Sequence, residues 1–146
     1  MSRTDPLRAY NFLLRVGNHT AHFTSCSQLG VDVEVIKYRE AGLNEQVRWL
    51  PGRVEYSEVV LRYGLTKDAF IWNWLESAVT GQIRRENVTI TALDYEGQAG
   101  GVPTVSWVLE EAWPCRWRGA LLDTLSREAA IESVTLVFEK LRREPA

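Results

Sequence analysis

The 146-residue sequence has little cysteine, no excess of basic residues and no long apolar run. Its two cysteines, Cys26 and Cys115, are far apart and form no CxxC pair, which argues against a disulfide framework or a zinc site. We expect both as buried thiols, since free cysteine is among the most often buried residues. The net charge of −2 lacks the basic footprint of nucleic-acid binding. Because no stretch of about 18 apolar residues occurs, we expect a soluble protein without a membrane span.

The motifs of common enzyme sites are also missing. No GxGxxG, Walker loop or GxSxG elbow occurs, and Gly97, Gly100 and Gly101 lack the strand-to-helix context of a phosphate loop. Glu110 and Glu111 are adjacent, and neighbours on a strand point to opposite faces, so they cannot act together as acid and base. We therefore expect no catalytic residue.

One group of residues has the character of metal ligands. His19, His22 and Cys26 form an HxxHxxxC pattern on a turn and on both faces of one predicted strand. Structural zinc takes four ligands, and only three candidates are present. We expect neither a metal nor a cofactor.

The length fits a single domain spanning residues 1–146, with enough chain to bury a core. The first ten residues contain Asp5 and no apolar segment, unlike a secretory signal, so we expect synthesis and assembly in the cytoplasm. Pro6 favours an extended backbone at the residue before it. Residues 1–8 are therefore predicted to be an extended arm, with Pro6, Arg8 and Tyr10 as contacts, and residues 142–146 a frayed tail.

Alternating apolar and polar side chains predict about seven to nine short strands. The main ones are Ala9–Val16, Ala21–Ser27, Val31–Val35, Val54–Val60, Val88–Ala92, Val105–Glu110, Cys115–Arg118 and Ala130–Lys140. Pro114 should lie at an edge, bulge or bend. Asp68–Thr80 is the one predicted helix, capped by Thr66, and its apolar stripe should pack on a sheet. The fold class is mainly β: a small barrel or sandwich with one covering helix.

The connection from Arg39 to Gly52 is long for a loop inside a compact domain. Such loops are functional or disordered, and disorder requires few apolar residues. This one carries Leu43, Val47, Trp49 and Leu50. We therefore predict a contact surface for another molecule. The alternative is that Trp49 folds back into the core of its own chain.

Seven short motifs in order resemble the tail tube proteins of contractile phages and phage-like contractile injection systems. They are Asp5–Phe12, Val33–Gly42, Leu50–Gly52, Arg62–Thr66, Trp72–Leu75, Ala112–Pro114 and Ala129–Glu132, and the match extends to about Leu141. The resemblance implies a fold related to the Hcp protein of type VI secretion. It also implies hexameric rings that stack into a rigid hollow tube inside a sheath, which pierces a target envelope and conducts DNA or toxin.

The resemblance further implies partners and interface residues. The partners are other copies of the chain, the sheath, and baseplate and terminator proteins, in a virion tail or injection particle. The inter-ring interface is predicted at Arg39, Glu40, Leu43, Asn44, Val47, Trp49, Leu50 and Pro51. The candidate channel face carries short hydroxyl side chains: Thr89, Thr91, Ser133 and Thr135.

Two alternatives remain open from the sequence. One is a tube-initiating baseplate subunit, which shares the fold of the main tube subunit. The other is a monomeric β-barrel that binds a ligand against Trp107 and Trp117. A ring several times the mass of the monomer would favour the tube.

Overall fold

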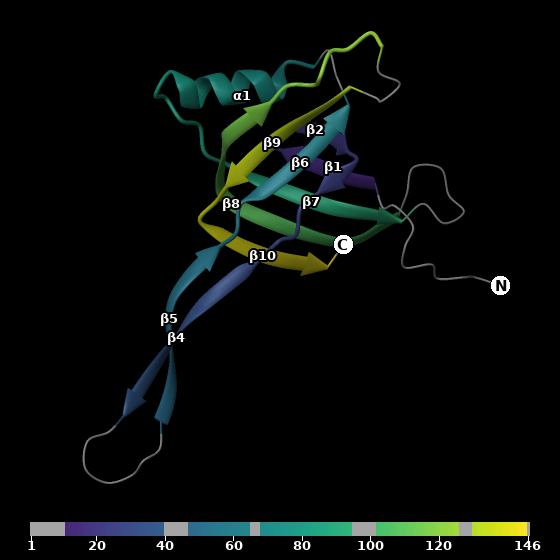
Figure 1. The fold of residues 1–146 in the computed structure, drawn as a ribbon. Coiled ribbons are helices and arrows are strands. Elements are labelled where there is room, and N and C mark those ends of the chain that lie inside the picture. Colours follow the sequence, from purple (N-terminus) through teal and green to yellow (C-terminus); the bar gives the residue numbers. More distant parts are fainter. Residues whose placement is uncertain (1–10, 40–46, 65–67, 95–101, 126–129, 146) are drawn as a thin grey trace, which may run out of the picture.

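The computed structural model describes residues 11–39, 47–64, 68–94, 102–125 and 130–145. These residues form a body of strands with one helix, from which a long hairpin projects (Figure 1). The elements in chain order are β1 (Asn11–Val16), β2 (His19–Phe23), β3 (Ser25–Cys26), β4 (Val31–Arg39), β5 (Val47–Tyr56), β6 (Val59–Gly64), α1 (Phe70–Val79), β7 (Glu86–Asp94), β8 (Val102–Arg118), β9 (Ile131–Val137) and β10 (Lys140–Pro145). The predicted fold class, mainly β with one helix, is confirmed.

The body is one bent sheet with strand order β2-β1-β7-β8-β9-β6-β3, and β10 also pairs with β8. The seventeen-residue strand β8 joins the two halves: residues 105–110 lie between β7 and β10, and residues 113–118 pair with β9. Between these parts Glu111 has a φ of 56°, which non-glycine residues rarely adopt. Its N–H donates to Asn87 Oδ1 at 3.3 Å. This bend lets a single strand serve both halves.

Pro114 lies where the sequence places it. It pairs with Leu136, and the register shifts between Pro114 and Arg116, as at a bulge. The sequence predicts two strands around this point, whereas β8 is continuous.

The core lies between the two halves of the sheet. One half contributes Leu14, Val16, Val88, Ile90 and Leu109, and the other contributes Val59, Leu61, Val134 and Leu136. The helix α1 lies across the end of the body opposite the hairpin (Figure 1). It buries Ile71 and Trp74, and Trp74 Nε1 donates to the carbonyl of Arg84 at 2.7 Å. Covering by a single helix is therefore confirmed, and the predicted cap Thr66 lies outside the described residues.

The predicted frayed tail is wrong for residues 142–145. The segment predicted as one strand, Ala130–Lys140, ends as β9 at Val137, and the chain returns as β10 along β8. Arg142 bridges Glu110 at 2.7 Å and Glu144 at 2.9 Å. Charged side chains are common on edge strands because they discourage further pairing. The polarity of this strand therefore reflects its edge position.

Among the described segments, no helix has the length and apolar character needed to cross a membrane.

Candidate assembly interface

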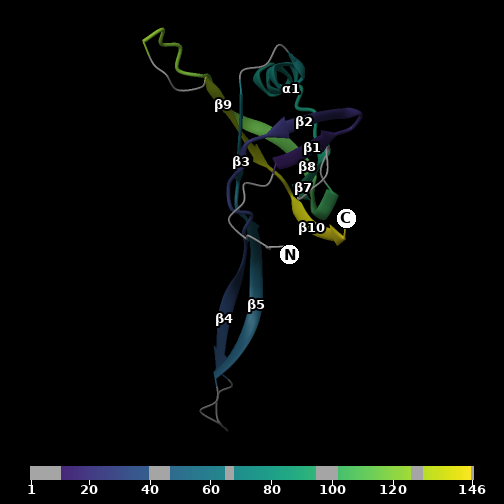
Figure 2. The same ribbon diagram turned by 90° about the vertical axis from the view of Figure 1, so that its right-hand side faces the viewer.

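The hairpin of β4 and β5 stands away from the body (Figures 1 and 2). Within the described residues its two strands pair only with each other. The predicted loop from Arg39 to Gly52 is wrong at its described ends, which are strand: Arg39 ends β4, and Val47, Trp49, Leu50 and Pro51 lie on β5. Of the other predicted interface residues, Glu40, Leu43 and Asn44 lie outside the described residues.

A bulge explains why this strand reads as a loop. Pro51 and Gly52 are poor strand residues, but β5 has one extra residue here, because Val33 pairs with Val54 and Val35 pairs with Pro51. Such an irregularity accommodates proline and glycine within a strand pair. Pro51 and Gly52 mark the position of the irregularity in the sequence, and the structure shows that β4 and β5 pair on both sides of it.

The register sorts the hairpin side chains onto two different faces. One face, here called the valine face, carries Val31, Val33, Val35, Lys37 and Arg39 from β4 and Tyr56, Val54, Pro51, Trp49 and Val47 from β5. The opposite face carries Asp32, Glu34, Ile36 and Tyr38 beside Glu55, Leu50 and Arg48. Because side chains alternate along a strand, the first face is mainly apolar and the second is mixed.

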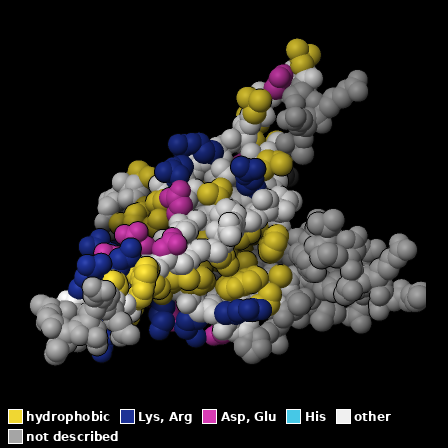
Figure 3. Space-filling model, turned by 60° about the horizontal axis from the view of Figure 1, so that its bottom comes forward, with side chains coloured by type: hydrophobic (Ala, Val, Ile, Leu, Met, Phe, Trp, Pro, Cys, Tyr) yellow, Lys and Arg dark blue, Asp and Glu magenta, His cyan; other side chains and the backbone are white. Residues whose placement is uncertain are grey.

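The valine face is open to solvent in the single chain. Val31, Val33, Val35 and Val54 are each about half exposed, and Trp49 is 64% exposed. The alternative that Trp49 folds into its own core is therefore wrong. Its ring contacts Lys37, whose Nζ lies 5.0 Å from the ring centroid. Figure 3, which brings the hairpin end forward, shows hydrophobic side chains at the surface beside basic ones.

This exposure is energetically unfavourable for a free chain. A two-stranded hairpin is at best marginally stable alone in water. Fully burying one valine contributes roughly 1.5 kcal/mol or more, so covering four half-exposed valines would contribute on the order of 3 kcal/mol or more. An apolar face of this kind marks a surface that another molecule covers.

The valine face is the candidate surface that sequence reasoning did not single out. The alternation in Val31–Val35 predicts a strand with one packed face. All nine residues of β4 are exposed. Periodicity indicates that a face is packed and carries no information about which molecule covers it.

The four candidate channel residues lie on two different outer faces of the body. Thr89 and Thr91 point away from the core on β7, where Thr91 Oγ1 lies 3.0 Å from Ser106 Oγ. Ser133 and Thr135 point away from the core on β9. The sequence-based set of four therefore does not form one surface.

Thr135 also lacks the exposure that a channel residue needs. It is only 3% exposed and lies beside Arg116, which bridges Glu58 at 3.4 Å. We remove Thr135 from the candidates, because a threonine that its own neighbours cover does not line an open channel.

The other residues of interest have ordinary structural surroundings. Cys115 is exposed, contrary to the prediction of two buried thiols, and it lies at the register shift between Pro114 and Arg116 on β8. Cys26 is partly buried, and desolvation raises its pKa to about 11. His19 stacks on Phe70 with centroids 4.1 Å apart, and His22 lies on the opposite face of β2.

Two tryptophans are the candidate ligand contacts of the alternative function, a monomeric β-barrel that binds a ligand. Trp107 and Trp117 both pack against the core, and Trp117 Nε1 donates to Tyr63 Oη at 3.3 Å. The arm residues Pro6, Arg8 and Tyr10 lie outside the described residues.

Comparison with known structures finds the same fold in chains of contractile injection systems and in Hcp proteins. A chain of the sheath-tube complex of an extracellular contractile injection system, PVC, in its extended state superposes with a TM-score of 0.80 at 22% identity, covering 98% of this chain and 94% of that one. A chain of the anti-feeding prophage baseplate gives 0.74 at 23%, covering 99% and 98%. Hcp1 from Flavobacterium johnsoniae gives 0.58 at 11%, covering 93% and 96%. These similarities show the fold.

A comparison with curated proteins gives no match. The family comparison identifies the chain, because the pattern described as "T4-like virus tail tube protein gp19" matches residues 8–142, nearly the whole sequence. The match includes the complete hairpin and both halves of the sheet. This protein belongs to the family of T4-like virus tail tube proteins.

Proposed function

We propose that this chain is the repeating subunit of the inner tube of a contractile tail or injection system. Rings of six copies stack into a rigid hollow tube that pierces the target envelope and conducts cargo. The observation that carries this function is the hairpin: a long strand pair with an exposed apolar face and no partner of its own among the described residues. Membership of the tail tube family supports the same reading.

The hairpin explains how rings would stack. It projects from one end of the body, whereas α1 covers the other end (Figure 1). A contact between the hairpin of one copy and the body of another joins two different surfaces, and repetition of such a contact along an axis gives an open stack. Val47, Trp49, Leu50 and Pro51 therefore contact the adjoining ring, together with the valines that precede them.

We assign the channel to the outer face of β6 and β9, which carries Ser133 and Arg62. β5 passes into β6 after only two residues, so the strand that reaches the next ring belongs to this half of the sheet. The side chains on the outer face of this half would therefore form a row along the tube axis. Thr89 and Thr91, on the other outer face, would then point away from the channel.

The remaining elements of the function follow from assembly rather than chemistry. The tube would be built in the cytoplasm, enclosed by a sheath and bounded by baseplate and terminator proteins. DNA or toxin would pass through without sequence-specific binding, in keeping with the net charge of −2. The protein would work mechanically and without a catalytic step.

A tube-initiating subunit of the baseplate is the second candidate, favoured by the similarity to a baseplate chain. The two functions differ in copy number: an initiating subunit would form one ring, and the main subunit would repeat along the tube. Electron microscopy of negatively stained particles that carry a label on this chain separates them. Label along the whole tube is the expected result, label at one end indicates the initiating subunit, and a strict monomer absent from particles would refute both.

A further inference from the structure

The connection between β8 and β9 carries an apolar cluster that the hairpin contact does not use. Leu121 and Leu122 are each 80% exposed and Leu125 is 91% exposed, the three highest values among the large hydrophobic side chains of the described residues. We call residues 121–125 the leucine segment. Three neighbouring leucines in water are unfavourable, and such a patch commonly marks a contact with another protein.

The leucine segment follows a tightly packed part of the chain. A Cβ on Gly119 would lie 2.9 Å from Trp117 Cη2, so the ring packs tightly on the backbone where the segment begins. Trp117 is held in turn by Tyr63 and by Trp72, whose ring meets it edge-on at 5.1 Å. Beyond the base, Asp123 Oδ1 accepts the N–H of Leu125 at 2.9 Å. The segment therefore projects from a rigid anchor.

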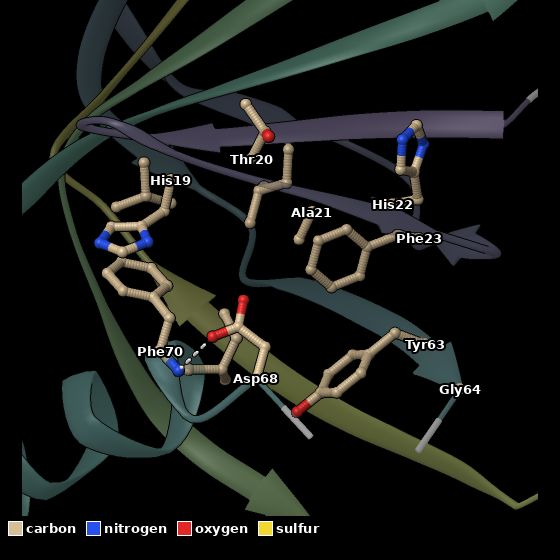
Figure 4. Close-up of a pocket in the computed structure, with 12 residues that line it drawn as sticks. His19, Thr20, Ala21, His22, Phe23, Tyr63, Gly64, Asp68 and Phe70 are labelled. Atoms are coloured by element: carbon tan, nitrogen blue, oxygen red, sulfur yellow. Dashed lines mark hydrogen bonds between the residues drawn. The ribbon is translucent and has the colours of Figure 1, made fainter. Parts of the chain in front are cut away.

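A pocket of about 240 Å³ opens between β2, β6 and the start of α1 (Figure 4). Its deeper walls are the apolar side chains of Leu14, Val16, Phe23 and Ile71. The stacked rings of His19 and Phe70 form one side of it, and Tyr63 and Asp68 lie on another (Figure 4). Among the described strands, β2 pairs only with β1, so the sheet is not closed at this pocket.

We propose that the leucine segment of one copy inserts into this pocket of the neighbouring copy in the same ring. This inference rests on the proposed tube function. It assigns a second interface, at the opposite end of the body from the hairpin, with a second copy of this chain as the occupant.

The two surfaces match in chemistry and size. The segment is an uncovered apolar protrusion, and the pocket is a recess with an apolar interior. A cavity of about 150 Å³ holds a benzene molecule, so a pocket of about 240 Å³ has room for at least one leucine side chain.

The two surfaces meet at Tyr63. It lines the pocket, and its hydroxyl accepts from Trp117 Nε1 at the base of the leucine segment, which reaches out on one side of the body (Figure 2). A contact between two unlike surfaces is head-to-tail, and such contacts close into a ring when the rotation between copies closes. The projecting β4–β5 hairpin points away from both surfaces, so the leucine contact joins copies within a ring and the hairpin joins successive rings.

Disulfide trapping between two differently marked chains tests the contact. All chains carry Cys115→Ser, which removes the exposed native thiol. One chain then carries Ala21→Cys, at the pocket, and the other carries Leu121→Cys, Leu122→Cys or Leu125→Cys. We expect a covalent dimer from at least one mixed assembly after oxidation and none from either chain alone. The matched control pairs Ala21→Cys with Val79→Cys, an equally apolar and 77% exposed position on α1, and should give none.

A second experiment removes the segment's apolar character. The triple variant Leu121→Ser, Leu122→Ser and Leu125→Ser should keep the thermal unfolding temperature of the wild type, because these side chains are already in water, and should form at least tenfold fewer rings by size-exclusion chromatography. The control Val79→Ser should form rings normally.

The outcomes separate this contact from the tube itself. Normal rings from the triple variant, with no cross-link in any mixture, would overturn the leucine contact and leave the tube function standing. Cross-links within a single chain carrying both cysteines, in monomers, would overturn it in favour of an occupant from the same chain. A wild-type chain that forms neither rings nor tubes would count against the tube function and the contact together.

Discussion

Trp49 provides the sharpest test of the hairpin interface. In the single chain its side chain is 64% exposed, and Lys37 Nζ lies over its ring, 5.0 Å from the centroid. Replacing Trp49 with alanine should therefore affect the isolated chain little, by about 0.5–1 kcal/mol for an exposed cation–π contact. In the tube the effect should be much larger, because the exposed part of the indole is buried there.

The size of that effect follows from the area. An aromatic side chain buries about 150–250 Å², and the exposed share of Trp49 is 64%. At roughly 25 cal/mol per Å² the remaining burial is worth about 2.5–4 kcal/mol per contact. This matches the scale of interface residues that dominate binding, about 2 kcal/mol or more, and corresponds to an association constant weaker by roughly 60-fold or more.

Tube length in negatively stained samples is the assay, with thermal unfolding of the unassembled chain beside it. We expect Trp49→Ala to give short tubes or single rings and a nearly unchanged unfolding temperature. Val79→Ala is the control, because Val79 lies on α1, is apolar and is 77% exposed. It should leave both stability and stacking intact. Tubes of normal length from Trp49→Ala would refute the interface.

Three further predictions concern the valine face, the channel and a thiol. Val33→Asp, on an exposed strand, should leave the chain folded but prevent tube formation, whereas Asp32→Val on the opposite face should assemble; electron microscopy distinguishes them. For the channel, Ser133→Cys and Thr89→Cys chains are treated with a bulky polymer-linked maleimide. In assembled tubes the cysteine at 133 should be protected and the one at 89 should react, whereas both should react in unassembled chains. The reverse pattern would place the channel on the β7 face. Burial raises the pKa of Cys26 from 9.0 to about 11, so the unfolded chain loses this proton first and the free energy of unfolding should fall as pH rises from about 9 to 11. Cys26→Ser should flatten that part of the profile, and an unchanged slope would contradict the assignment.

Several elements could be predicted from local sequence because local physics produces them. The β1–β2 hairpin follows from Gly17, whose φ of 58° suits a tight turn. The helix follows from the apolar stripe that includes Ile71 and Trp74, both buried. The strand β7 follows from Val88 and Ile90, which alternate with threonines and are buried.

Other elements depend on residues far apart in the chain. β10 is a strand because β8 lies beside it, and its residues Lys140–Pro145 have no strong pattern of their own. The bend at Glu111 separates two pairing partners of β8, and Asn87, which binds its N–H, comes from another strand. Neither feature can be seen in a local window, because each exists only after the sheet forms.

The hairpin shows most clearly what each level determined. The sequence by itself determined that Val31–Val35 and Val54–Val60 are strands with one packed face, since alternation is a local property. Only the tertiary structure decided that this face is left uncovered by its own chain and that Trp49 belongs to it. The physical reason is that burial depends on which surfaces meet in space, and periodicity along the chain is the same whether a strand packs inside its own molecule or against a neighbour.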